Sequence, residues 1–208
     1  MVKIKEPHQK YFNVIENERL NMEDIDPNTH LINCQIYSSV DIDKIDEVKF
    51  EHCTFDHNDF SSVELLDVIF IHCDLSNGKF EKSVLYRVLF EKCKLIGASF
   101  FYSRLKDVFW DDCFLSYTNF SEANITNVKF EAGMLNSSSF QQVTFKSLLF
   151  RNIDIDEIDL SETTLKGLDL SHAEFNHIRI DRMLADGLVI RHDQAYKLVS
   201  HFGIKVTN

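Results

Sequence analysis

A strict five-residue period of large apolar residues constrains this chain more than any other feature of its sequence. From Ile45 to Ile180, every fifth position holds Ile, Leu, Phe or Trp, which makes 28 consecutive matches. Because 44% of the residues are hydrophobic, chance would give such a run with a probability on the order of 10⁻¹⁰. The period fits neither a helix nor a flat strand, and it predicts short extended segments separated by tight turns.

A second column, made of small or β-branched residues, lies two positions before the large one. Residues two apart on an extended backbone point to the same side, so both columns should face one interior. The small column also repeats every twenty residues, as in Val48, Val68 and Val88, so four pentapeptides make one coil. We expect the core to include these members of the two columns: Phe70, Phe90, Trp110, Phe130, Cys53, Cys73, Cys93 and Cys113.

Coils of four short sides stack into a square parallel β-helix, a solenoid in which each coil adds about 4.8 Å. Residues 45–183 then form the regular β-helix, with roughly seven coils and a length of roughly 34 Å. Residues 1–44 keep an imperfect register, and we predict a capping segment with irregular first coils, because a solenoid must cover its open end. Residues 184–208 lose the period and are predicted to form a short amphipathic helix and a strand from Ile204 to Val206.

The pattern of a small residue, any residue, Leu or Phe, and two further residues resembles the pentapeptide-repeat family. It is visible in Val68-Ile-Phe-Ile-His-Cys-Asp-Leu-Ser-Asn and in Ala98-Ser-Phe, and it runs without a break from residue 45 to 183. The resemblance implies an all-β fold, a right-handed quadrilateral parallel β-helix, to which the sequence adds a short C-terminal α-helix.

The charge balance indicates the kind of partner that the chain can bind. It has 33 acidic and 22 basic residues, a formal net charge of −11. Direct binding to nucleic acid needs clustered Lys and Arg, so we expect none, whereas the acidic balance permits basic partners. No apolar run approaches a membrane span, and the start Met1-Val-Lys-Ile-Lys-Glu-Pro lacks a signal-peptide core, so a cytoplasmic protein without membrane contact is predicted.

Acidic residues should gather outward on the wall built on Phe50, Phe70 and Phe90, whereas the wall of Leu85 and Leu105 carries Lys and Arg. The predicted partner-binding residues are Glu51, Glu91, Asp111, Asp112, Glu131, Asp154, Asp156 and Glu157. Apolar residues also point outward on the acidic wall: Ile69, Ile71, Leu89 and Phe109. They mark either an interaction surface or the place where the N-terminal segment folds over the rod.

Catalytic and metal chemistry are not indicated. Stacked cysteines form a line rather than a tetrahedron, with Cβ atoms about 4.8 Å apart against about 3.8 Å in a disulfide, so the cysteine column should be structural. His52 and His72 face water next to core cysteines and lack a third ligand. The chain has no phosphate-binding Gly-rich loop, nucleophile elbow or Ser/His/Asp set. We therefore predict no enzyme activity, no metal or other cofactor, and no small-molecule substrate.

The C-terminal end is similar to that of Qnr-type fluoroquinolone-resistance proteins, above all those of Gram-positive bacteria. The similarity is carried by Thr164-Leu-Lys-Gly-Leu-Asp-Leu-Ser, Gly187-Leu-Val-Ile, Gln194-Ala and Phe202-Gly-Ile. It implies a homodimer through the C-terminal segment and binding to DNA gyrase or topoisomerase IV, with protection from quinolones or inhibition. By position, the dimer contact would comprise Leu198, Val199, Phe202, Ile204 and Val206. The same helix could instead cap the last coil, or do both.

DNA mimicry is the mechanism that the resemblance implies. B-DNA carries one negative charge per about 1.7 Å of axis, and residues 45–183 include 23 acidic and 14 basic residues. The density of negative charge along the rod is therefore lower than along DNA, unless the carboxylates gather on one or two faces. The chain departs from Gram-negative Qnr proteins because no loop interrupts its coils, so binding could persist without protection. The alternative is a cytoplasmic scaffold with another protein partner, because a fold does not fix a function.

Overall fold

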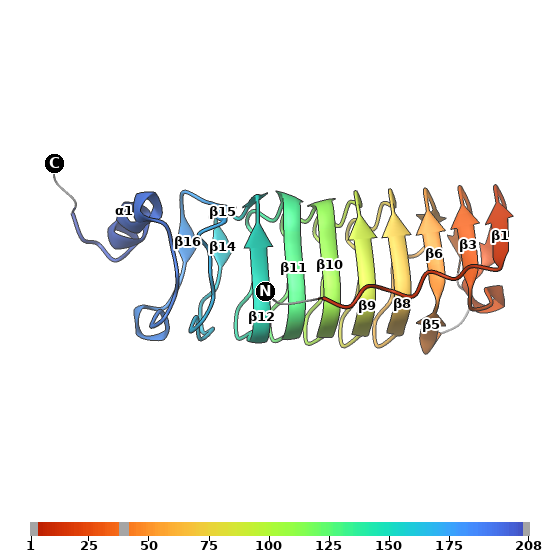
Figure 1. Ribbon diagram of the computed structural model, residues 1–208, viewed down its shortest axis with the longest axis horizontal. Coiled ribbons are helices and arrows are strands. Elements are labelled where there is room, and N and C mark those ends of the chain that lie inside the picture. The colour runs from red at the N-terminus through yellow and green to blue at the C-terminus, as the bar shows by residue number, and fades with distance from the viewer. Residues whose placement is uncertain (1–3, 38–41, 206–208) are drawn as a thin grey trace.

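The computed structural model describes residues 4–37 and 42–205, without the side chains of Ser200 and His201. The chain winds into a parallel β-solenoid of about 8 turns, with the helix α1 (His192–His201) at one end and the first coil at the other (Figure 1). This confirms the predicted solenoid with a short C-terminal helix. None of the described helices is long and apolar enough to cross a membrane.

Short parallel strands build the walls, and every strand pairing in the described residues is parallel. The first coils contain β1 (Asn13–Glu16), β2 (Arg19–Asn21), η1 (Met22–Asp24), β3 (Thr29–Ile32), β4 (Gln35–Tyr37), β5 (Lys44–Asp46), β6 (Val48–Glu51) and β7 (Thr54–Phe55). The middle coils contain β8 (Glu64–Ile71), β9 (Val84–Glu91), β10 (Arg104–Phe114), β11 (Asn124–Met134) and β12 (Thr144–Arg151). The last coils contain β13 (Ile153–Asp154), β14 (Ile158–Asp159), β15 (Ala173–Glu174), β16 (Ile178–Arg179) and η2 (Arg182–Leu184).

The register advances by twenty residues per coil in the regular part of the rod. Strands β9 and β10 place Val88 beside Val108 and Phe90 beside Trp110. In the first coils the step is irregular, because Leu31 of β3 pairs with Phe50 of β6, nineteen residues later. We name three walls of the rod by one core residue each: the Leu85 wall, the Phe90 wall and the Cys93 wall. Each wall also contains the equivalents of that residue on the other coils, at steps of twenty residues.

Tight turns recur at every fifth residue, as the period predicts. At the corner between the Leu85 and Phe90 walls, Asp67, Arg87 and Asp107 have φ values of 55°, 53° and 55°. A left-handed backbone costs a residue other than glycine roughly 1–2 kcal/mol. The turns offset this cost through hydrogen bonds to the next coil, such as that from His72 N to Glu91 O, at 3.0 Å.

Both periodic columns lie inside the rod. Of the 28 large positions, 26 are buried, and Phe55 and Phe145 are half-buried. Consecutive rings of the Phe90 wall stack at centroid distances of 5.0, 5.4 and 4.5 Å, through Phe70, Phe90, Trp110 and Phe130. Rings of opposite walls meet edge to face, as Phe80 and Phe90 do, which is the second favourable arrangement of aromatic pairs. The interlocked stacks make each coil depend on its neighbours.

The cysteines form the structural column that the sequence predicts. All five are buried and free, and each periodic thiol lies near a backbone carbonyl of the preceding coil, as Cys113 Sγ does at 3.3 Å from Phe90 O. Burial raises the pKa of the Cys53 thiol to about 12. A thiol that stays protonated near neutral pH is a poor nucleophile and metal ligand.

Helix α1 closes the C-terminal end of the rod, one of the two roles expected of it. The fully buried Gln194 donates from Nε2 to Leu170 O at 3.1 Å and to Ala173 O at 2.9 Å. This side chain thereby supplies donors that a further coil would otherwise provide. The strand expected from Ile204 to Val206 is wrong in its described part, since residues 204 and 205 form no strand, and Val206 lies outside the described residues. With α1 over the last coil, residues 204 and 205 have no strand to pair with in the described part of the chain.

Candidate protein-interaction surface

A row of carboxylates runs along the Phe90 wall. Strand pairing places Glu91, Asp111 and Glu131 side by side on consecutive coils, and Glu51 precedes them, separated by Ile71. The order predicted for this row is therefore confirmed. Because coils repeat about every 4.8 Å, neighbouring carboxylates lie close enough to repel one another.

Burial and repulsion act together at Asp111. Burial, followed by the charges of Glu131 and Glu91, raises the pKa of this carboxyl above its usual range. Glu51 behaves in the opposite way, because Lys49 Nζ at 2.8 Å and His30 Nε2 at 2.9 Å bind it. The hydrogen bond from Lys49 is the main cause that lowers the pKa of Glu51. Lys49 and His30 thus offset the negative charge of the row at Glu51.

The predicted acidic residues form two groups rather than one continuous surface. The row on the Phe90 wall ends at Arg151, which pairs with Glu131. The carboxylates of the second group, Asp154, Asp156 and Glu157, lie on the Cys93 wall, where Asp154 pairs with Met134 on the preceding coil. The exposed Asp112 occupies the turn between the two walls.

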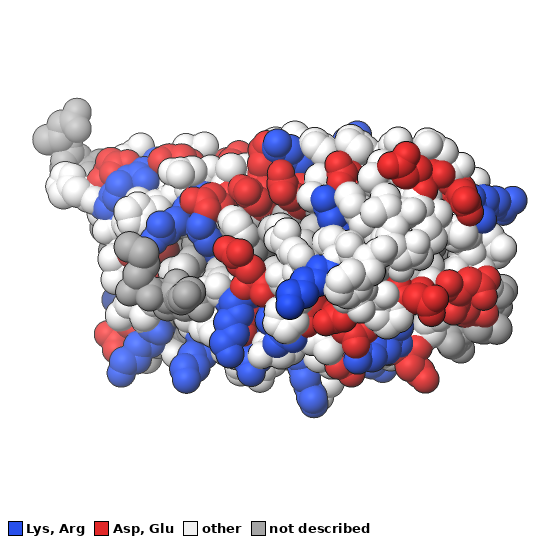
Figure 2. Space-filling view, turned by 45° about the vertical axis from the view of Figure 1, so that its right-hand side comes forward, with Lys and Arg blue, Asp and Glu red and all other residues white. Residues whose placement is uncertain are grey.

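Lys and Arg lie among these carboxylates. On the Phe90 wall, Lys129 forms an ion pair with Glu131, and Lys92 Nζ lies 3.9 Å from Glu91 Oε1. The Leu85 wall, expected to be basic, carries Arg104 and Lys106 and ends at the acidic Asp107. Figure 2 shows both signs interspersed over the visible face. Sorting of charge by wall is therefore partial.

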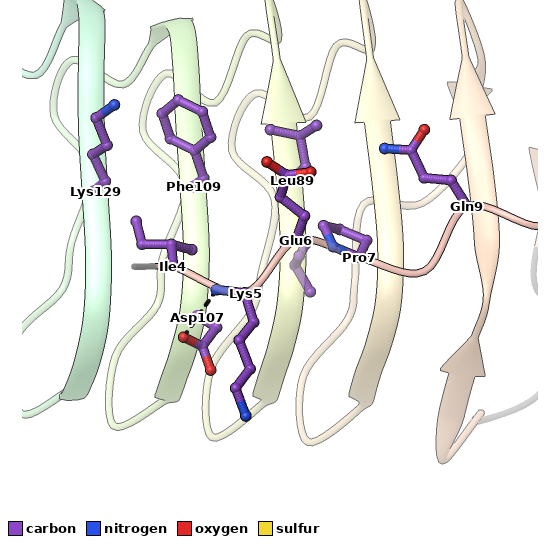
Figure 3. Close-up of a pocket in the computed structure, with 10 residues that line it drawn as sticks. Ile4, Lys5, Glu6, Pro7, Gln9, Leu89, Asp107, Phe109 and Lys129 are labelled. Atoms are coloured by element: carbon purple, nitrogen blue, oxygen red, sulfur yellow. Dashed lines mark hydrogen bonds between the residues drawn. The ribbon is translucent and has the colours of Figure 1, made fainter. Parts of the chain in front are cut away.

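The N-terminal strap, residues 4–9, lies extended across β10, β9 and β8 (Figures 1 and 3). His8 N donates to Asp67 Oδ1 at 3.0 Å, and Lys5 N donates to Asp107 Oδ1 at 3.3 Å. The strap runs over the outward apolar side chains of the Phe90 wall, and Ile69 is only 1% exposed. Of the two readings of these apolar residues, the N-terminal cover is confirmed.

A cavity of about 450 Å³ lies between the strap and the wall. Figure 3 shows Ile4 and Glu6 of the strap near Leu89, Phe109 and Lys129, which line the cavity with them. This cavity was not identified from the sequence. The signal that could have revealed it is the run of apolar residues at outward positions, which requires a cover.

A clasp of polar side chains fixes the strap at Asp67. The Nε of Arg87 donates to Asp67 Oδ1 at 2.6 Å, while His8 Nδ1 lies 3.5 Å from Asp67 Oδ2 and 3.8 Å from Glu47 Oε1. His8, Glu47 and Asp67 offer ligand atoms within 4.8 Å of one another. Because Arg87 already occupies both oxygens of Asp67, the cluster is better suited to hold the strap than to bind a cation.

The residues predicted to form a dimer lie in or after α1. Leu198 is 8% exposed and Phe202 packs against the core of the same chain, whereas Ile204 is 52% exposed. The apolar face of the helix is therefore used at least partly for capping. Met183 and Tyr196, which the sequence did not single out, are 89% and 55% exposed at this end.

The Cys93 wall carries exposed apolar side chains that sequence reasoning also missed. Phe114 is 43% exposed and Tyr117 is 66% exposed, and Phe114 pairs with Met134 beside the second acidic group. Exposed aromatic residues are enriched in protein-binding surfaces. Their outward positions in the five-residue frame were the available signal.

Comparison with known proteins identifies the repeat. Residues 83–160 match a family model described as a pentapeptide repeat region. The middle of the rod is therefore a pentapeptide repeat region. No curated protein sequence matches the chain.

Three solved structures resemble the solenoid. Full-length QnrB1, a plasmid-mediated fluoroquinolone resistance protein, is 19% identical with a TM-score of 0.49, over 92% of this chain and 100% of that one. HetL, a pentapeptide repeat protein involved in heterocyst differentiation regulation in Nostoc sp., is 15% identical with a TM-score of 0.35, over 88% and 85%. A pentapeptide repeat protein from the thylakoid lumen of Arabidopsis thaliana is 25% identical with a TM-score of 0.28, over 52% and 66%.

Proposed function

We propose that this pentapeptide-repeat protein is a cytoplasmic, non-catalytic protein that binds DNA gyrase or topoisomerase IV at a DNA-binding surface of the enzyme. Binding there would inhibit the enzyme or protect it from fluoroquinolones. The observation that carries the proposal is the in-register row of Glu91, Asp111 and Glu131. The C-terminal similarity to Qnr-type proteins names the class of partner.

The geometry of the row suits a surface that binds phosphates. Its carboxylates repeat about every 4.8 Å, and the phosphates of one DNA strand about every 3.4 Å. The carboxylates stand on a β-wall, so little backbone entropy is lost when a partner binds. Burial, followed by the charges of Glu131 and Glu91, raises the pKa of Asp111, and Lys or Arg of a partner would relieve the repulsion among these carboxylates.

We also propose that the C-terminal end forms a homodimer, which would double the length of the acidic rod. Exposed side chains at this end, including Ile204, support the proposal. Leu198 already caps the rod of its own chain, so Asp at this position would damage the cap as well as a dimer. Ile204→Asp is the better test, and a dimer that persists on a sizing column would remove this contact.

A gyrase supercoiling assay, with and without ciprofloxacin, tests the function. The protein should inhibit supercoiling or reduce drug-stabilised cleavage, and the variant Glu91→Gln/Asp111→Asn/Glu131→Gln should lose the effect. The matched control neutralises the second group through Asp154→Asn and Asp156→Asn. If both variants and the unmodified protein behave alike, the Phe90 wall is not the contact.

The second candidate is a scaffold that binds a different protein through the Cys93 wall. Exposed Phe114 and Tyr117 favour it, because aromatic anchors contribute much of the binding free energy in protein interfaces. If micromolar protein has no effect on supercoiling or cleavage, only this candidate remains. Phe114→Ala and Tyr117→Ala should then weaken capture of the partner, and both should leave any gyrase effect unchanged.

A further inference from the structure

Two buried carboxylates at one corner of the rod hold the strap by its backbone. Asp67 is 2% exposed and Asp107 is 1% exposed, and both stand at the corner between the Leu85 and Phe90 walls, two coils apart. Asp67 accepts the N–H of His8, and Asp107 accepts the N–H of Lys5. The contacts use main-chain donors, which every residue except proline has.

The spacing of the two carboxylates matches that of an extended peptide. Two coils of the solenoid advance by about 9.6 Å. Three residues of extended chain, the separation of Lys5 from His8, cover about 9.9 Å at 3.3 Å per residue. The corner therefore sets a register of three peptide residues per two coils, and its floor is the apolar row of Leu89 and Phe109.

The strap does not supply a hydrogen-bond donor to every carboxylate oxygen at this corner. Asp107 Oδ1 accepts from Lys5 N at 3.3 Å and from Asn127 Nδ2 at 3.2 Å. Asp107 Oδ2, in contrast, is buried without a hydrogen-bond partner among the residues that the structure describes. A buried carboxylate oxygen without a donor is unfavourable. Asp107 also lines the cavity under the strap (Figure 3), which leaves room for a further side chain.

The charges around the corner favour a cationic donor there. Asp107 adjoins the Phe90 wall, with the carboxylate row of Glu91 and Asp111. Two cations near the corner are engaged, since Arg87 binds Asp67 and Lys129 binds Glu131. A Lys or Arg side chain that reached Asp107 Oδ2 would form a charge-assisted hydrogen bond, which is stronger than a neutral one.

We propose that the corner groove under the strap is a docking site for an extended basic segment of a partner protein. In this proposal, the strap is an intramolecular occupant that the partner segment displaces. The segment would donate two backbone N–H groups three residues apart to Asp107 and Asp67, and a Lys or Arg side chain to Asp107 Oδ2. The proposal does not depend on the identity of the partner, so it stands or falls separately from topoisomerase binding.

The test uses the full chain with its strap loosened. Lys5→Pro together with His8→Pro removes both N–H donors, and Gln9→Pro is the matched control because it removes neither. The probe is a fluorescein-labelled peptide of residues 4–12 with Lys5→Arg, since Figure 3 shows Lys5 and Asp107 on the same side of the strap. Binding is measured by fluorescence anisotropy.

We expect the double-proline variant to bind the probe at least tenfold more tightly than the unmodified chain and the Gln9→Pro control, because the intramolecular competitor is weakened. Adding Asp107→Asn should reverse the gain. Equal affinities, an effect that survives Asp107→Asn, or equal binding of a peptide with Lys5→Glu and Lys10→Glu would overturn the proposal.

Two further measurements complete the test. Light scattering of the double-proline variant should show the same mass as the unmodified chain; a doubled mass would assign the groove to the strap of a second copy and overturn the proposal. If the double-proline variant does not fold, Asp107→Asn in the unmodified chain takes its place. Trypsin should then cleave after Lys5 at least severalfold faster, and an unchanged rate would contradict the role of Asp107.

Discussion

Phe90→Ala is the substitution whose effect the stacked core predicts most directly. Phe90 is fully buried and lies between Phe70 at 5.0 Å and Trp110 at 5.4 Å, with its ring within 4° of both. It also meets Phe80 edge to face, at 6.3 Å and 89°. Its removal breaks one stack and one contact between walls, in the middle of the rod.

The expected loss is large. A buried Phe→Ala change costs about 3–5 kcal/mol of the free energy of unfolding, from lost transfer energy and the cavity left behind. The rings above and below are held by strand pairing at a fixed spacing, so they cannot close the cavity, and we expect the upper half of that range. For a chain of this size the melting temperature should fall by roughly 10 °C or more.

Urea unfolding followed by circular dichroism measures the loss. The matched control is Phe114→Ala, the same change on the neighbouring strand β10 at a side chain 43% exposed, which should cost less than about 1 kcal/mol. Hydrogen exchange should also show the loss concentrated in β8, β9 and β10, because each coil contacts only its neighbours. Equal losses for both variants would refute the interlocked core.

Three further predictions concern the corner, the acidic row and the cap. Asp67→Asn should cost about 3 kcal/mol by leaving Arg87 unpaired. Although burial opposes it, the Arg87 guanidinium lowers the pKa of Asp67. The stabilisation by the ionised Asp67 is therefore present above the unfolded pKa of about 3.9 and is lost as pH falls through the folded pKa. Urea titrations at several pH values would show this loss, and a difference between the variants that does not depend on pH would contradict it. Asp111→Asn should raise the melting temperature at pH 7, because the raised pKa of Asp111 means that its ionised form is disfavoured in the folded protein. The gain in melting temperature should shrink as pH falls through that pKa. A loss of stability at pH 7 would contradict the repulsion between the carboxylates. Gln194→Ala should cost about 1–3 kcal/mol by removing the two hydrogen bonds from Nε2 to Leu170 O and Ala173 O. Hydrogen exchange in the last coil should become faster, and unchanged exchange would show that the side chain is not the cap.

The regular part of the rod could be predicted from the sequence because one physical requirement repeats in it. Every coil must bury one large and one small residue per side, so residues such as Phe90 and Cys93 indicate the period, the register and the core together. The turns follow from the same period. The row of Glu91, Asp111 and Glu131 was also accessible, since outward residues twenty apart must stack.

The remaining features depend on contacts that no period encodes. The strap has no repeat of its own, and its position is set by Asp67 and Asp107, which read as ordinary outward residues in the repeat. The cap depends on the single side chain of Gln194, and the expected strand at Ile204 lacks a neighbour to pair with. The sequence also separates the second acidic group from the row. Residues of one row lie at steps of twenty, and the number of residues from Asp111 to Asp154 is not a multiple of twenty.

Displacement of DNA from gyrase tests the central claim most directly. A fluorescein-labelled DNA duplex bound to purified gyrase is titrated with the protein, and anisotropy reports the fraction of DNA still bound. Competition by a surface of carboxylates predicts full displacement, weakened by added salt, and a severalfold loss of potency in Glu91→Gln/Asp111→Asn/Glu131→Gln. DNA that stays bound while the protein also binds gyrase would contradict the claim.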